Sequence, residues 1–302
     1  MFDSIGIIGA GRIAHILLGG WQHTATALPP IRVYDVSTDA LSKLKAAFPQ
    51  VHISTLEETS NSDLLLLGVH PPVLADLLPQ IRPLLRPEAL VCSLAPKLRL
   101  PQLQAQLGGF GRLARMNPNA TSIIGQGMNP LVFAPQLPEA ARHNLRTLFA
   151  PLGQLPEVAD EQLESYAVIS AMGPTYFWFQ FHALEQLAES FGLARHEARQ
   201  AIATMLHGAV DTLLSSELPP EVVMDLVPVR PLADDEETIT NLLATRLRAI
   251  HGEELAHFEL LRDHLGTLGR RYGDFDAHDG LWQMAERMRA DLLARLALVP
   301  RT

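Results

Sequence analysis

The first residues that could do chemistry form a short run of small side chains near the N-terminus. The run has the spacing G-x-G-x-x-G/A, and it comprises Gly9, Ala10, Gly11, Arg12, Ile13 and Ala14. In this pattern Gly9 permits a tight turn, Gly11 lets a pyrophosphate approach the backbone, and Ala14 lets a helix pack closely on a strand. Free N–H groups at the start of such a helix bind anions. A glycine turn without a ligand has the same spacing, but an apolar strand before it and a helix after it favour dinucleotide binding.

An acidic side chain follows the second predicted strand. Asp35 is placed where a carboxylate accepts hydrogen bonds from the ribose hydroxyls of a dinucleotide. A carboxylate there repels a 2′-phosphate, so we expect NAD(P)H as cofactor with a slight preference for NAD(H). Two alternatives stay open. Asp35 is equally suited to a helix cap or a surface position, and Arg12, Ser37 and Thr38 are close enough in sequence to hold a phosphate.

The elements that must position these residues alternate between strands and helices. Short apolar runs predict strands at residues 4–9, 31–34, 51–54, 63–69, 89–94 and 111–116. Helical spacing predicts helices at residues 12–20, 38–48, 73–78 and 100–107. This alternation is typical of an α/β fold with a doubly wound parallel sheet. We therefore predict a Rossmann dinucleotide-binding domain over residues 1–158.

The pattern changes in the second half, where strand-like runs are absent. Helical spacing predicts helices at residues 175–191, 195–214, 234–268 and 279–298. We expect an all-α dimerisation and substrate domain over residues 159–302. The aromatic cluster Phe177, Trp178, Phe179 and Phe181 covers more than one face of its helix. Part of it should contact another subunit, which predicts a homodimer or a multiple of dimers.

Composition excludes several classes of function. The 302-residue chain has a net charge of −9 without a basic patch, which argues against nucleic-acid binding. Cys92 is the only cysteine, so neither an intrachain disulfide nor a thiolate metal cluster is possible, and we expect it buried. No secretory signal or long apolar segment is present, so a cytoplasmic protein without membrane contact is expected. The spacing of His257 and His264 matches no metal motif, and no metal is expected.

Four stretches, in order along the chain, carry a resemblance to a known family. They are Val69-His70-Pro71-Pro72, Arg115-Met116-Asn117-Pro118-Asn119 with Gly125-Gln126-Gly127, Ser170-Ala171-Met172-Gly173-Pro174-Thr175-Tyr176, and Phe191-Gly192-Leu193-Ala194-Arg195-His196-Glu197-Ala198. Together they resemble the pyrroline-5-carboxylate reductases over residues 4–227. The resemblance implies a Rossmann domain, a helical dimerisation domain, and hydride transfer from a nicotinamide to a cyclic imine as small-molecule substrate.

The resemblance also implies cofactor contacts at the carboxyl ends of the strands. By position these are Gly9, Ala10, Gly11, Arg12, Ile13, Ala14, Val69, His70, Pro71, Ala95, Pro96 and Asn119. Turns at this edge of a parallel sheet are where dinucleotides bind, so the physical argument agrees. For Asn119 a simple turn or helix cap is the alternative.

The departures from the family concern the substrate. Its hydroxyl- and glycine-rich substrate loop is replaced by residues 227–233, which contain no serine, threonine or glycine. His182 replaces a glutamate, and Lys97 follows Ala95-Pro96 in place of a glycine. We take His182 and Lys97 as candidate catalytic residues, and Arg230, Met172 and Thr175 as candidate substrate contacts. His182 is alternatively a polar helix residue satisfied by a neighbour, and Arg230 a surface arginine.

Two other classes of function were weighed. The β-hydroxyacid dehydrogenases use a lysine in their helical domain, and this chain has no lysine after Lys97, which excludes them. A non-catalytic dinucleotide sensor that has lost the substrate loop remains open. The favoured interpretation is an oxidoreductase acting on a CH–NH group, with an imine substrate different from pyrroline-5-carboxylate.

Overall fold

The computed structural model describes residues 2–95 and 98–252, with the backbone alone at residues 71 and 72. The chain divides into two compact units, residues 1–184 and a second unit that begins at Glu185, within helix α8 (Pro174–Ser190). Each unit is described by itself. The expected domain division at residues 158 and 159 stays a prediction.

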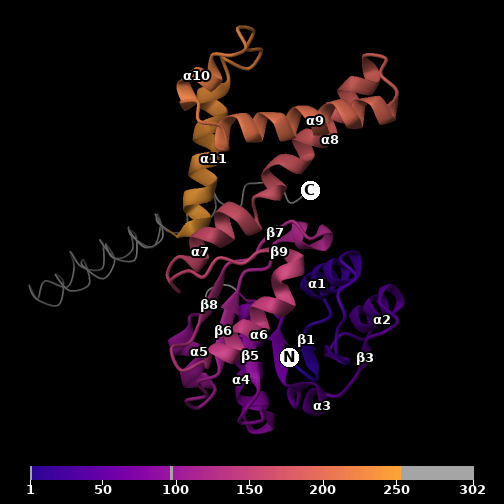
Figure 1. The fold of residues 1–302 in the computed structure, drawn as a ribbon, viewed down its shortest axis with the longest axis vertical. Coiled ribbons are helices and arrows are strands. Elements are labelled where there is room, and N and C mark those ends of the chain that lie inside the picture. Colours follow the sequence, from indigo (N-terminus) through magenta and orange to yellow (C-terminus); the bar gives the residue numbers. More distant parts are fainter. Residues whose placement is uncertain (1, 96–97, 253–302) are drawn as a thin grey trace, which may run out of the picture. The chain divides into compact units, whose positions relative to one another are not determined.

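The first unit is built on a seven-stranded sheet (Figure 1). Its strand order is β3-β2-β1-β4-β5-β6-β8, and all neighbours are parallel except β6 and β8. The strands are β1 (Ile5–Ile8), β2 (Ile31–Tyr34), β3 (His52–Ile53), β4 (Leu64–Leu67), β5 (Leu90–Ser93), β6 (Leu113–Met116) and β8 (Leu131–Phe133). A second, two-stranded parallel pair joins β7 (Gly127–Met128) and β9 (Gly153–Gln154). The predicted doubly wound Rossmann fold is confirmed.

Helices cover both faces of this sheet, and a separate apolar cluster fills each side. One cluster joins the sheet to α1 (Arg12–His23), α2 (Thr38–Ala47) and α6 (Glu139–Phe149). The other joins it to α4 (Pro71–Ile81), α5 (Leu100–Gln106) and α7 (Leu163–Tyr166). β1 and β4 have every residue buried, as strands covered on both faces require.

Several elements of the first unit had not been predicted, among them β7, β9, α7 and the three that follow. Helix α3 (Leu56–Ser60) is only five residues long, and a capping box between Thr55 and Glu58 fixes its start. Strand β8 has three residues, too few for a periodic pattern, and it adds an antiparallel edge. Helix α6 follows Pro138, and Ala141, Leu145 and Phe149 form its buried face at helical spacing. That spacing was present in the sequence and was missed.

The remaining turns of the first unit are short. They are the 3₁₀ turns η1 (Arg82–Leu84), η2 (Ala120–Ile124) and η3 (Ala150–Leu152), and the π-helical segment η4 (Ala167–Ala171). Segment η4 lies between α7 and α8, and Met172 N–H extends its bonding by donating to Ala167 O at 3.0 Å. π-helical turns are rare in proteins, and those that occur often lie at functional sites. The stretch from Ala167 to Met172 is therefore a candidate part of the site.

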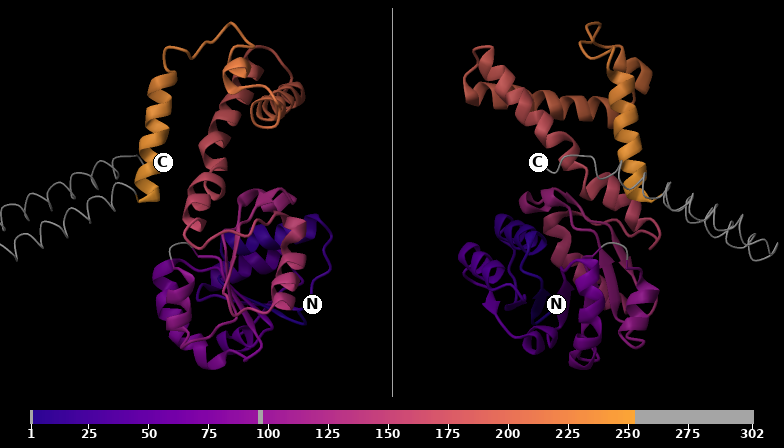
Figure 2. Two further views of the ribbon diagram at one scale, coloured as in Figure 1. Left: turned by 60° about the vertical axis from the view of Figure 1, so that its left-hand side comes forward. Right: turned by 180° about the vertical axis from the view of Figure 1, so that it is seen from behind.

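The regular elements in the described part of the second unit are all helices, joined by loops (Figure 2). After the end of α8 it contains α9 (Arg195–Leu214), α10 (Pro220–Met224) and α11 (Glu236–His251). The predicted bounds of α9 are confirmed, and α11 ends at His251 with Gly252, at φ +90°, as its C-cap. Residues 253–268, where further helix is expected, lie outside the described residues. The helix expected at residues 279–298 lies outside the described residues. Within the described ranges, no helix is both long and apolar enough to cross a membrane.

Candidate functional site

The turn after β1 has the geometry that the glycine pattern predicts. Gly9 has φ +109°, and a Cβ atom there would lie 2.6 Å from the carbonyl oxygen of Gly68. Gly11, by contrast, has φ −81°, and a Cβ atom on it would have no neighbour within 4 Å. Gly9 is therefore required by the fold, while the absent side chain of Gly11 leaves open space. That space is what a pyrophosphate needs, so the turn fits a dinucleotide.

Helix α1 begins directly behind this turn. Its N-cap residue is Gly11, which provides no side-chain hydrogen bond, and no acidic residue lies in the first turn. The N–H groups of the first turn therefore have no side-chain cap, and they carry the positive end of the helix dipole. An anionic group bound at Gly11 would accept hydrogen bonds from these N–H groups and be stabilised by the helix dipole.

Asp35 lies just beyond the end of β2, where it was predicted to bind ribose. Its Oδ2 accepts the Ala10 N–H at 2.7 Å, and its Oδ1 accepts the Ser37 N–H at 2.8 Å. The carboxylate thus ties the glycine turn to the start of α2, which Ser37 caps through the Ala40 N–H at 3.2 Å. Each carboxylate oxygen has a further lone pair, so the bonds to the chain leave acceptor capacity for ribose hydroxyls.

A hollow of about 610 Å³ opens beside the glycine turn within the first unit. Its lining comes from the turn, α1, α2, η2 and α8, and it comprises Ala10, Gly11, Arg12, His15, Ile16, Asp39, Ala40, Lys43, Ala120, Ile123 and Trp178. Lys43 Nζ lies 2.7 Å from Asp39 Oδ2. The sequence analysis did not single out His15, Asp39 and Lys43. His15 is three residues after Arg12 on α1, and Lys43 is four residues after Asp39 on α2, spacings that place side chains on one helix face.

The turn after β4 adjoins the turn after β1. β1 is hydrogen-bonded to both β2 and β4, so the direction of the chain across the sheet reverses between β1 and β4. Ligands of open α/β sheets bind at such a reversal, beyond the carboxyl ends of the strands. Val69 and His70 follow β4 here, and His70 is the exposed N-cap of α4 with Pro71 as first helical residue. Their predicted cofactor contacts have the required location.

The candidate residues at the far end of the sheet are more enclosed. Ala95 is buried after β5, while Pro96 and Lys97 lie outside the described residues. Asn119 is buried after β6, and its Oδ1 caps η2 by accepting the Thr121 N–H at 2.9 Å. Its Nδ2 donates to Ser170 O at 2.6 Å. The capping role weighed for Asn119 is therefore present, and its cofactor contact stays a prediction.

The candidate substrate residues fall in different units. Met172 is half-buried after η4, and Thr175 is exposed at the start of α8, with its hydroxyl donating to Met172 O at 2.7 Å. His182 is exposed on α8, also within the first unit. Arg230 belongs to the second unit, where it forms an ion pair with Glu236 beside a hollow of about 290 Å³. Met172 and Thr175 therefore lie together in the first unit, whereas Arg230 belongs to the second unit.

The single cysteine takes no part in this site. Cys92 is fully buried in β5, and burial raises the pKa of its thiol to about 12. It is therefore an unreactive core residue, as expected. In the part of the chain that the structure describes, no group of three or more histidine, cysteine or acidic residues could hold a metal ion. His257 and His264 lie outside that part.

Three family models match successive parts of the chain. Residues 4–96 match "NADP oxidoreductase coenzyme F420-dependent", and residues 160–230 match "Pyrroline-5-carboxylate reductase dimerisation". Residues 247–302 match "Protein of unknown function (DUF455)". The first two models thus cover the strand that precedes the glycine turn and the helices that follow the sheet.

Curated relatives extend the similarity across both parts. The chain is 29% identical to a pyrroline-5-carboxylate reductase of Pseudomonas aeruginosa over 218 residues, which is 72% of this chain and 80% of that protein. It is 24% identical to the Escherichia coli pyrroline-5-carboxylate reductase over 229 residues, covering 75% of this chain and 85% of the relative.

A solved structure shares the fold. The pyrroline carboxylate reductase of Plasmodium falciparum, crystallised with NADP bound, superposes with a TM-score of 0.71 at 18% identity, covering 84% of this chain and 97% of that one. The two family models, the relatives and the glycine turn agree with one another. The chain is thus similar to the pyrroline-5-carboxylate reductases along most of their length, and this similarity supports an NAD(P)-dependent oxidoreductase.

Proposed function

We propose that this protein reduces the C=N bond of a compact cyclic imine with NAD(P)H. The observation that carries the proposal is the open space at Gly11, in front of the uncapped start of α1. It lies beyond the end of β1, where the order of the strands across the sheet changes direction. The relatives named above are reductases of a cyclic imine, which supports the choice of reaction.

The roles of the chain's residues follow from this placement. The backbone at Gly11 and Arg12 would hold the pyrophosphate, and Asp35 would accept bonds from the ribose hydroxyls. Because the carboxylate of Asp35 repels a 2′-phosphate, we propose that NADH is used in slight preference to NADPH.

The reaction needs one hydride and one proton. When bound, the reduced nicotinamide supplies the hydride to the imine carbon, and the imine nitrogen gains the proton, so that a saturated amine forms. His182 is the candidate proton donor, because histidine is the side chain that most often serves as a general acid in enzymes. Lys97, which follows Ala95 by two positions in the sequence and lies outside the described residues, is the second candidate.

The substrate is proposed to differ from pyrroline-5-carboxylate. The segment at residues 227–233 offers few donors to a carboxylate, because Pro228 and Pro231 lack an N–H group and Val229 and Leu232 have apolar side chains. Arg230 is its only charged side chain, and Glu236 already compensates that charge. Losing hydrogen bonds to a charged group costs about 1.5–3 kcal/mol each, which lowers catalytic efficiency by powers of ten.

The same segment supports a second candidate function. A protein that retained the dinucleotide turn but lost the donors of its substrate loop could serve as a non-catalytic sensor of the cofactor. Such a sensor would bind NADH or NADPH tightly and would turn over no imine.

One experiment separates the two candidates. Oxidation of NADH and of NADPH is followed with a panel of cyclic imines, with and without a carboxylate, that includes pyrroline-5-carboxylate. We expect turnover on an imine other than pyrroline-5-carboxylate, with kcat/KM for the latter below about 10⁴ M⁻¹s⁻¹. Cofactor binding without turnover on any imine would contradict the reductase and favour the sensor.

Assembly is the last part of the proposal. In the second unit, the end of α8, the residue that follows it and α9 expose large apolar side chains, including Leu187, Phe191, Met205, Val210 and Leu214. Exposed apolar side chains in this number favour a protein interface. Together with the matched dimerisation model, it supports a homodimer or a multiple of dimers formed through these helices.

A further inference from the structure

A buried arginine at the end of β6 is enclosed by two carboxylates. The side chain of Arg115 has no exposed surface, and its Nη1 lies 2.5 Å from Asp160 Oδ1 and its Nη2 2.9 Å from Glu164 Oε1. Its Nε has no hydrogen-bond partner among the described residues. A guanidinium in such a place needs nearby negative charge, so both carboxylates compensate it.

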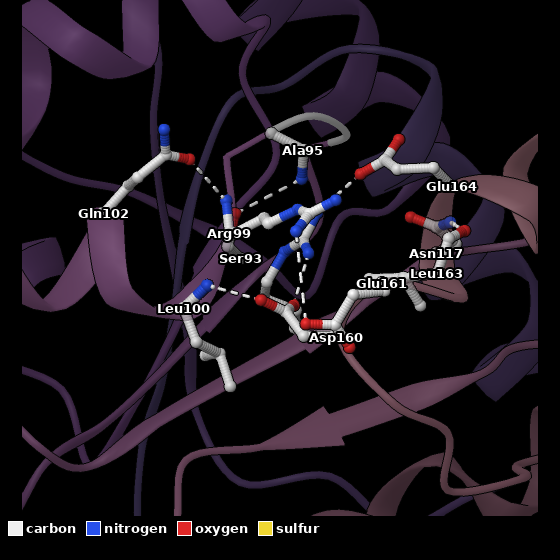
Figure 3. A network of polar contacts seen from close by, with 11 residues as sticks. Ser93, Ala95, Arg99, Leu100, Gln102, Asn117, Asp160, Glu161, Leu163 and Glu164 are labelled. Carbon is white, nitrogen blue, oxygen red and sulfur yellow. Dashed lines mark hydrogen bonds and ion pairs between the residues drawn. The ribbon is translucent and has the colours of Figure 1, made fainter. Parts of the chain in front are cut away.

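Asp160 has a second partner. Its Oδ2 accepts the backbone N–H of Leu100 at 3.0 Å, and Leu100 is the first residue of α5 (Figure 3). One carboxylate therefore links β6, the segment that leads into α7, and the beginning of α5, across sixty positions of sequence. Because Asp160 has both oxygens engaged, a shift of Arg115 would be transmitted to Leu100.

The linked segments lie beyond the carboxyl ends of β5 and β6, where Ala95 and Asn119 are predicted to contact the cofactor. The turn that follows β5 lies between Ser93 and Leu100. The chain that follows β6 is bonded to the stretch from α7 to η4 through two side-chain amides. Asn117 Nδ2 donates to Leu163 O at 2.5 Å, and Asn119 Nδ2 donates to Ser170 O at 2.6 Å, two residues before Met172.

We infer that Asp160 is a positioning residue for hydride transfer. It fixes the beginning of α5, and with it the end of the turn after β5, relative to Arg115 and to the segment that carries Met172 and Thr175. The inference rests on the proposed function, since it assumes that the nicotinamide and the imine meet at this end of the sheet. Asp160 itself need not touch either of them.

Three variants of the full-length protein test the inference. Asp160→Asn keeps the shape of the side chain, but its amide has a single acceptor oxygen. It therefore cannot accept from both Arg115 and Leu100 as the two carboxylate oxygens do. Glu164→Gln removes the other ion pair of Arg115 and leaves the bond to Leu100. Glu161→Gln is the matched control, because Glu161 is exposed and forms only a weak ion pair. Its Oε1 lies 4.0 Å from Nη1 of Arg99, which is also exposed. Each variant is assayed for kcat, NADH affinity, the isotope effect with NADH deuterated at C4, and amide exchange in the peptide containing Leu100.

We expect Asp160→Asn to lower kcat about tenfold or more, the scale of one charge-assisted hydrogen bond. It should also change the isotope effect and speed exchange at Leu100, whereas Glu161→Gln should stay within about twofold of wild type on every readout. An equal loss of kcat in Glu164→Gln without faster exchange at Leu100 would overturn the inference, because Asp160 would then only compensate Arg115. So would an unchanged kcat in Asp160→Asn.

The test also separates this inference from the proposed function. If the wild-type protein reduces no imine, the proposed function fails, and NADH affinity and Leu100 exchange decide the inference alone. Weaker NADH binding together with faster exchange in Asp160→Asn would then support a positioning role toward the cofactor. Unchanged NADH affinity would overturn it.

Discussion

At the scale of single residues, Asp35 combines a structural and a proposed binding role. Its two oxygens already join the glycine turn to the start of α2 through the N–H groups of Ala10 and Ser37. A ribose bound there would add further bonds to a carboxylate that the chain has oriented in advance. Preorganised acceptors of this kind lose little entropy when a ligand binds.

The choice of cofactor is the first prediction at this scale. Replacing Asp35 with serine removes the negative charge that repels a 2′-phosphate, so the ratio of kcat/KM for NADH to that for NADPH should fall about tenfold or more. Steady-state assays with both cofactors measure it. Asp76→Ser, an exposed acid on α4, is the control and should leave the ratio unchanged. A wild-type protein that clearly prefers NADPH would contradict the assignment of Asp35.

Asp63 provides a prediction on stability. Its Oδ2 accepts from Ser4 Oγ at 3.0 Å and from Asp3 N at 3.1 Å, and its Oδ1 pairs with Arg86. Burial alone would raise the pKa of this carboxyl, but the bonds from Ser4, Arg86 and Asp3 outweigh burial and lower its pKa.

A lowered pKa means that the stabilisation is present above the pKa of the unfolded chain and is lost as pH falls through the folded value. Asp63→Asn should therefore lower the free energy of unfolding by about 1–2 kcal/mol near pH 7, and by less near pH 3. Urea unfolding at both pH values checks this. A deficit that is equally large at the acid pH would show that shape, and not charge, matters at Asp63.

At the scale of elements, the turn after β1 makes opposite demands on its two glycines. A Cβ atom on Gly9 would collide with the Gly68 carbonyl in a left-handed conformation, while one on Gly11 would point into open space. Gly9→Ala should therefore destabilise the fold by about 2 kcal/mol or more. Gly11→Ala should fold normally but weaken NADH binding about tenfold or more, because the methyl group occupies the pyrophosphate's place.

Thermal unfolding and NADH titration of both variants check this pair of predictions. Gly208, in the exposed middle of α9 with nothing within 4 Å of its Cβ position, provides a matched glycine control. Normal NADH affinity in Gly11→Ala would contradict the assignment of the glycine turn as the phosphate site.

The elements differ in how far the sequence could predict them. Buried parallel strands such as β1 and β4 are continuous apolar runs, and helices such as α9 show a long periodic face, so their positions followed from pattern alone. The strand β8 and the helix α3 are too short for a period. The bounds of β8 depend on pairing with β6, which is not a local property of its residues.

The candidate site shows the same division. The locations of Gly9, Gly11 and Asp35 were predictable, because a turn, a strand end and a helix start can be recognised from residues close together in sequence. The bond from Leu100 to Asp160 was not, because it joins residues sixty positions apart through packing of the sheet. Asn119 fitted a ligand contact and a cap equally well in sequence, and its bonds to Thr121 and Ser170 appear only in the fold.

At the scale of the whole molecule, assembly is the prediction that follows from exposed apolar surface. Phe191 is 80% exposed at the end of α8, and Leu214 is 75% exposed at the end of α9. Light scattering at micromolar concentration should give twice the chain mass of 33.2 kDa, or a multiple of that. Phe191→Asp should shift the equilibrium toward the monomer, because a charge would be buried in the interface. A wild-type monomer would contradict a dimer through these helices.

Direct transfer of hydride to an imine carbon tests the central claim most directly. The protein is incubated with NADH deuterated at C4 and with the cyclic imine that gives the fastest turnover, and the amine product is analysed by mass spectrometry and NMR. The account predicts one deuterium on the former imine carbon, from one face of the cofactor only, and none from solvent at that carbon. Tight NADH binding with no deuterated amine from any imine of the panel would contradict it.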